Sequence, residues 1–175
     1  MTGIDREILV APPWLRIAME EIGQAEIAGP VHNPRIIEYH ALTTLKATND
    51  ETPWCSSFVN WCIYHAGMTP TRSAAARSWL KWGVKLDSPR PGCIAVFRRG
   101  KSPTAGHVAF YVGHDDWFVR VLGGNQSDKV CYARYPSMEL LGYRWPDADD
   151  EMLASKWAQQ VGQRAVELAR QMEVG

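Results

Sequence analysis

The residues of this sequence best suited to covalent chemistry are its four cysteines and five histidines. Cys55 follows the segment Thr52-Pro53-Trp54, which is typical of the start of a helix. Free backbone N–H groups and the positive end of the helix dipole favour a thiolate at such a place. The pattern therefore predicts that Cys55 is an activated nucleophile, although a buried cysteine without a chemical role would give the same pattern.

The other three cysteines are expected in the core. Cys62 lies seven residues after Cys55, on nearly the same face of the expected helix, and Cys93 and Cys131 lie in strand patterns. The cysteines form no CxxC pairs, which disfavours a zinc site. We expect neither a metal nor a cofactor.

A thiolate nucleophile normally needs a histidine as its base. His107 follows Gly106 and begins an expected strand over 108–112. A strand end is rigid and still open to substrate, which suits a catalytic base. The remaining histidines are expected in turns or on helix surfaces: His32, His40, His65 and His114.

Pairing across the next hairpin points to a third polar residue. A turn near 115–116 would pair residues whose numbers sum to about 231, so the partner of His107 would lie near position 124. Asn125 is thus expected to accept the imidazole Nδ1–H and to orient the ring, as the third member of a triad does. Gln126 and Asp128 are alternatives, and a purely turn-forming role for Asn125 also fits.

Apolar periodicity and turn residues indicate the elements that must position these groups. Helices are predicted over 13–23, 34–45, 52–66, 75–82 and 149–172. Strands are predicted over 93–97, 108–112, 117–122, 130–132 and 141–144, and their short regular spacing favours a meandering antiparallel sheet. This order of helices, sheet and a final helix is typical of an α+β fold.

The bulk composition excludes several functions. The chain has 175 residues, 46% of them hydrophobic, and a formal net charge of zero, so we expect a globular monomer that captures neither nucleic acid nor anionic membrane by charge. It contains no stretch apolar enough to span a bilayer and no signal-peptide pattern at its start. Synthesis in the cytoplasm is therefore expected.

Five segments in order carry a family resemblance: TPWCSSFVNWC from Thr52 to Cys62, then PGCIAVFRRG, GHVAFYVG, VLGGNQSD and LGYRWP. Over about residues 14–146 the sequence resembles the CHAP and NlpC/P60 superfamily of cysteine hydrolases, and it looks closest to small CHAP-like phage proteins with PWC, GHV and GGNQ motifs. The resemblance implies a papain-like fold, in which a helix bearing the cysteine packs on an antiparallel sheet bearing the histidine and a polar third residue.

Carried onto this sequence, the resemblance implies a domain over 1–148, with Cys55 as nucleophile, His107 as base and Asn125 as orienting residue, followed by a helical extension over 149–175. It also implies a peptidoglycan substrate, cut by an N-acetylmuramoyl-L-alanine amidase or a peptide endopeptidase. Such a protein would act in the wall or periplasm as a phage lysin or as a delivered antibacterial effector. Its partners would then include a delivery machinery or an immunity protein.

Substrate contacts are expected from Trp54, Trp79, Trp82 and Gln126, with core packing as the competing interpretation for the tryptophans. Two other functions remain open: a catalytically silent wall-binding or virion structural protein, and a cysteine protease that acts on proteins. A metalloenzyme is disfavoured, because the sequence contains no HExxH motif.

Overall fold

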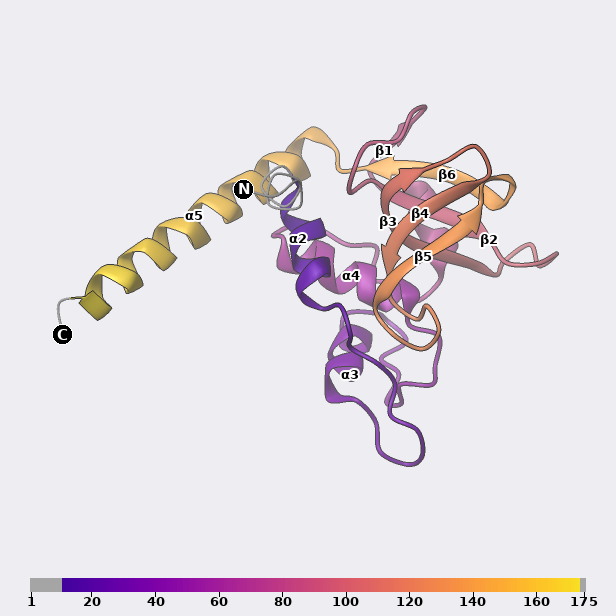
Figure 1. The fold of residues 1–175 in the computed structure, drawn as a ribbon, viewed down its shortest axis with the longest axis horizontal. Helices are drawn as coiled ribbons and strands as arrows, with labels where there is room; N and C mark the ends of the chain where they lie inside the picture. Colours follow the sequence, from indigo (N-terminus) through magenta and orange to yellow (C-terminus); the bar gives the residue numbers. More distant parts are fainter. Residues whose placement is uncertain (1–10, 174–175) are drawn as a thin grey trace.

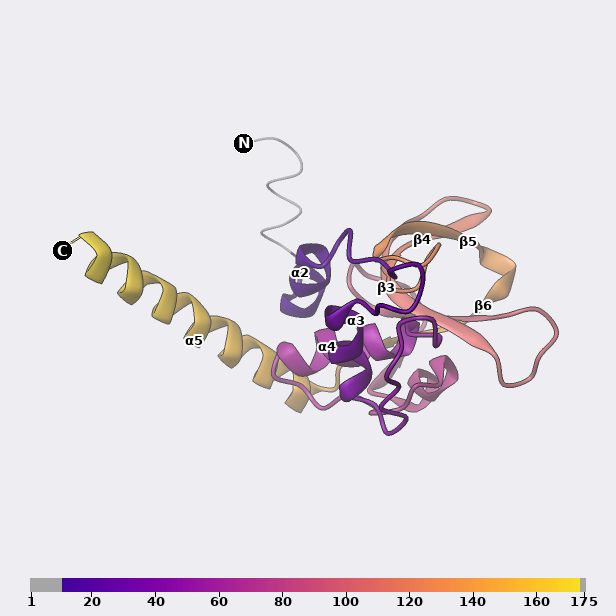
Figure 2. The same cartoon turned by 90° about the horizontal axis from the view of Figure 1, so that it is seen from below.

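The computed structural model describes the backbone of residues 11–173 and confirms the α+β class. Figure 1 shows a curved sheet on one side, short helices packed beside it, and a long final helix that leads away. The view from below in Figure 2 shows the same separation between helices and sheet.

Three helices precede the sheet, close to their predicted places: α2 (Pro13–Glu20), α3 (Pro34–Ala41) and α4 (Cys55–His65). Both α2 and α3 begin with proline, whose missing N–H costs nothing in the first turn. The side chain of Asn33 caps α3 by accepting from Arg35 N at 2.9 Å. Both helices end earlier than predicted. The predicted helix over 75–82 is a 3-10 helix, η1 (Ala76–Lys81).

The sheet has six strands in the order β1-β6-β2-β3-β4-β5, and all neighbouring strands are antiparallel. The strands are β1 (Val84–Leu86), β2 (Ile94–Arg98), β3 (Gly106–His114), β4 (Phe118–Gly123), β5 (Cys131–Pro136) and β6 (Leu140–Trp145). Strands β2 to β5 form the predicted meander. Strand β6 departs from it by returning to lie between β1 and β2, and β1 is a strand that the apolar pattern did not predict.

The sheet curls strongly. Tyr135 of β5 stacks on Phe97 of β2, with ring centroids 4.9 Å apart, although β3 and β4 separate these strands in the sheet. Figure 1 shows β4 and β5 crossing in front of β2 and β3. The curl brings residues from strands that are not adjacent to one end of the sheet.

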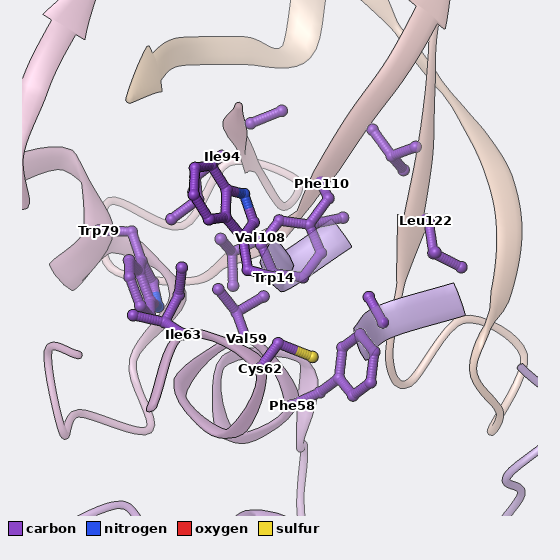
Figure 3. Close-up of a cluster of buried hydrophobic side chains, with 14 of the residues drawn as sticks. Trp14, Phe58, Val59, Cys62, Ile63, Trp79, Ile94, Val108, Phe110 and Leu122 are labelled. Atoms are coloured by element: carbon purple, nitrogen blue, oxygen red, sulfur yellow. The ribbon is translucent and has the colours of Figure 1, made fainter. Parts of the chain in front are cut away.

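Helix α4 is buried along most of its length, because it packs against β3 on one side and against α2 and α3 on the others. Its apolar side chains meet the inner face of the sheet in the cluster of Figure 3, where Phe58 and Phe110 form an edge-on ring pair 6.4 Å apart. Cys62 lies inside this cluster and Cys93 is also fully buried, so the core role predicted for these two thiols is confirmed.

The last helix, α5 (Ala148–Glu173), touches the rest of the protein only near its beginning among its described side chains. Ala154 is buried, and Trp157 lies over Gly67, where an added Cβ would be 3.1 Å from the tryptophan. No helix in the described part of the chain is long and apolar enough to cross a membrane.

Candidate active site

Cys55 is the first residue of α4, as predicted, and 9% of its surface is exposed. The residue before it, Trp54, caps the helix with backbone only. The backbone N–H groups of Val108 and Ser56 lower the pKa of the thiol, which opposes the effect of burial. Since Val108 follows His107 on β3, the start of α4 lies directly against the strand that carries the histidine.

His107 lies in β3 opposite Phe97 of β2, and 9% of its surface is exposed. Its imidazole stacks on the ring of Tyr135, with centroids 4.7 Å apart and planes 25° apart. Nε2 lies 3.0 Å from Oε1 of Gln126. If Nε2 donates this bond, Nδ1 is the nitrogen left to exchange a proton with a nucleophile.

Gln126 is itself held in place from the opposite side. Its amide nitrogen donates to the backbone carbonyl of Cys131, and the Cys131 thiol lies 3.2 Å from the backbone oxygen of Gln126. The loop that presents Gln126 contains three residues at positive φ: Asn125, Ser127 and Asp128. With both amide ends satisfied and 3% of its surface exposed, Gln126 has the contacts of a residue that orients His107.

Asn125 lines the same cavity as Cys55 and His107, but it binds a different group from the one expected. With its amide turned to satisfy both bonds, its oxygen accepts from the backbone N of Trp54 at 3.0 Å and from the indole Nε1 at 3.3 Å. The predicted bond to the imidazole is made instead by Gln126, at Nε2 rather than Nδ1. Asn125 therefore ties its loop to the start of α4.

Burial shifts the pKa values of Cys55 and His107 in the direction that favours the uncharged form of each. It raises the pKa of the Cys55 thiol, against the opposing effects of the backbone hydrogen bonds and of the Arg99 charge. It also lowers the pKa of His107 to about 4, although the bond to Gln126 favours the charged ring. The sequence predicted a thiolate at the helix start. Desolvation at this buried position opposes a thiolate, and the role of Cys55 as nucleophile stays a prediction.

A cavity of about 490 Å³ opens onto these groups. It is lined by Cys55, His107, Asn125 and Tyr135, together with the hairpin between β2 and β3. The cavity thus collects residues from α4, β3, β5 and the loop after β4.

The three tryptophans expected to contact substrate are interior residues. Trp54 and Trp79 are fully buried, and 8% of Trp82 is exposed. The Trp79 indole donates to Ser56 Oγ at 2.9 Å, and the Trp82 indole donates to the Thr69 carbonyl at 2.8 Å. Core packing is therefore the interpretation that their burial supports.

Asn60, which the sequence did not single out, shapes one wall of the site. This buried residue of α4 donates to the Ser73 carbonyl at 3.1 Å and accepts from Arg72 N at 2.6 Å. Ser56 Oγ donates to the same carbonyl at 2.7 Å. These bonds hold Arg72 and Ser73 against α4. The next three residues, 74–76, line the cavity. An asparagine inside an otherwise apolar helix was the available signal.

Tyr135 was also missed, because the predicted strand over 130–132 stopped before it. Across the part of the chain that the structure describes, no group of three or more His, Cys, Asp or Glu residues is arranged to hold a metal ion. A cysteine, a histidine bonded to an amide and an adjacent cavity form a set of groups capable of nucleophilic acyl transfer.

Comparison with known families places this set in context. Residues 47–125 match the family model of the CHAP domain, and no curated protein matches the chain. The matched segment includes both Cys55 and His107. CHAP domains are generally hydrolases, and the match supports a function of the peptidoglycan hydrolase type. The chain is therefore similar to the CHAP domain over residues 47–125, the segment that carries the cysteine and the histidine.

Proposed function

We propose that this protein is a cysteine hydrolase that cuts an amide bond in the peptide part of peptidoglycan. The observation that carries the proposal is the meeting of Cys55 and His107 at one cavity within the CHAP segment. Cys55 is the nucleophile and His107 is the base. Gln126 is the orienting residue that the contacts favour over Asn125.

The reaction begins from the neutral pair. His107 Nδ1 takes the proton of the Cys55 thiol as the sulfur attacks the amide carbonyl, and the imidazolium then gives this proton to the leaving amine. In this proposal the backbone N–H of Cys55, at the start of α4, donates to the oxyanion. His107 next takes a proton from water, whose oxygen attacks the thioester and displaces the Cys55 sulfur to release the acid. The imidazolium then returns its proton to this sulfur, which restores the neutral pair.

An amidase and a peptide endopeptidase would use these same steps, so the reaction does not depend on which amide is cut. The protein would act on the wall as a phage lysin or as a delivered antibacterial effector. In the second case we propose that an immunity protein covers the cavity around Cys55.

Digestion of purified peptidoglycan by Cys55→Ala tests the proposal. We expect wild type to release soluble fragments and Cys55→Ala to release none. Cys93→Ala is the control, because it alters a buried thiol just before β2 that does not line the cavity. Circular dichroism would show that both variants fold. Mass spectrometry of the fragments would separate amidase from endopeptidase products.

Equal digestion by wild type and Cys55→Ala would overturn the assignment of Cys55. Wall binding by wild type without any cleavage would favour a silent wall-binding protein. Cleavage of protein substrates in place of wall peptides would favour a protease.

A further inference from the structure

The hairpin between β2 and β3 brings basic side chains to the edge of the Cys55 cavity. Arg98 and Arg99 are exposed and line it. A second cavity, of about 550 Å³, shares Arg98, Gly100 and Glu139 with the first and adds Lys101 to the lining. The two cavities therefore adjoin. Cys55 lines the first cavity, and the basic side chains Arg98 and Lys101 line the second.

Three basic side chains share this edge with one carboxylate, that of Glu139, which also lines both cavities. Arg98, Arg99 and Lys101 form no ion pair with any residue that the structure describes. Arg77 is occupied in another way, because its guanidinium donates to the carbonyls of Ser102 and Ala105 at the base of the hairpin. The chain as a whole has no net charge, so the excess is local to this edge.

Arg99 acts electrostatically on the reacting groups themselves. Its charge lowers the pKa of the Cys55 thiol, of the His107 imidazole and of the Tyr135 phenol. These three groups come from α4, β3 and β5, and Arg99 lines the same cavity as all three of them. An unpaired guanidinium in such a place suits a planar carboxylate, which it can bind through two parallel hydrogen bonds.

We propose that Arg99 binds a free carboxylate of the substrate, on a residue next to the amide bond that Cys55 attacks. Arg98 and Lys101 extend the attraction toward the second cavity. The inference rests on the proposed function and adds a substrate class to it. The preferred peptide carries a carboxylate at this position, and the same peptide with a carboxamide there is a poor substrate.

Two synthetic wall peptides that differ only in this carboxylate or carboxamide provide the test. We expect wild type to cleave the carboxylate peptide with a kcat/KM on the order of 10- to 100-fold higher. Arg99→Gln should bring the ratio close to one, mainly by slowing cleavage of the carboxylate peptide. Arg120→Gln removes the same charge from a cavity that shares no lining residue with the Cys55 cavity, and it should keep the ratio.

Binding supplies a second readout that needs no turnover. In a Cys55→Ala background, calorimetry should show tighter binding of the carboxylate peptide, and Arg99→Gln should remove the difference. This result without cleavage by wild type would refute the proposed function and leave the Arg99 subsite standing. Equal binding of the two peptides, or a preference that survives Arg99→Gln or disappears equally in Arg120→Gln, would overturn the subsite.

Discussion

Burial favours the uncharged form of both members of the Cys55–His107 pair, since it raises the pKa of the thiol and lowers that of the imidazole. A thiol is a poor nucleophile, so the proton must move as substrate binds. The neutral imidazole is the form able to accept that proton. The groups that fix the imidazole, Gln126 and Tyr135, therefore matter to the rate as much as the basicity of the ring does.

The pH dependence of kcat/KM should report His107. The base works only when neutral, so activity is lost as the pH falls through its pKa, which lies at about 4. Gln126→Glu places a carboxylate against the ring, which favours imidazolium and raises this pKa. We expect the acid limb of the profile to move to higher pH in Gln126→Glu.

Gln126→Ala serves as the companion variant. It removes the bond to Nε2 without adding charge, and we expect kcat to fall on the order of 10- to 100-fold as the ring loses its orientation. An acid limb that stays in place in Gln126→Glu would show that residue 126 does not face the imidazole during catalysis.

The loop after β4 can approach α4 only because residue 124 is glycine. A Cβ at Gly124 would lie 2.5 Å from Trp54 Cζ3 and 2.7 Å from Phe58 Cβ. Gly124→Ala should therefore lower the free energy of unfolding by about 1–3 kcal/mol through overpacking, measured by urea denaturation.

Gly162→Ala is the matched control for this substitution. An added Cβ there meets nothing within 4 Å, and alanine favours a helix over glycine, so stability should hold or rise slightly. Unchanged stability in Gly124→Ala would mean that the loop moves away from α4 at little cost.

At the level of elements, the sequence predicted those with a strong local signal. Pro53 before Cys55 and Gly67 at the end marked α4, and the run after Gly106 marked β3. The assignment of Asn125 to the imidazole required the β3–β4 register to continue past its end. Pairing with β3 stops at Phe110 and Leu122, and the chain bends over residues 124–128, so strand alternation no longer decides which side chain faces the histidine.

Elements held by tertiary contacts were the ones missed. Strand β1 has only three residues, too few for a periodic pattern, and exists through its pairing with β6. An α-helix was predicted over 75–82. In the structure the indole N–H groups of Trp79 and Trp82 donate to Ser56 and Thr69, which are distant in the sequence. This part of the chain adopts the tighter 3-10 form.

The whole molecule divides into the sheet with its packed helices and an outward-leading α5 (Figures 1 and 2). Side chains over 159–164 are exposed, whereas Ala154 is buried against the rest of the protein. We expect truncation after Ala158 to leave the melting temperature and wall hydrolysis almost unchanged, measured by calorimetry and by fragment release.

Truncation before Asp147 would instead remove the contacts of Ala154 and Trp157, and it should lower the melting temperature. A large loss of stability on removing only 159–175 would show that the distal part of α5 supports the fold.

The position of β6 between β1 and β2 has a consequence for protein synthesis. Strands β1 and β2 leave the ribosome before β6, which ends at Trp145. Both of them pair with β6, so each lacks this neighbour until β6 has emerged. Since chains begin to fold from the N-terminus as they are made, the emerging sheet keeps open edges until residue 145 has left the ribosome. Completion of the sheet is thereby delayed until β6 has been synthesised.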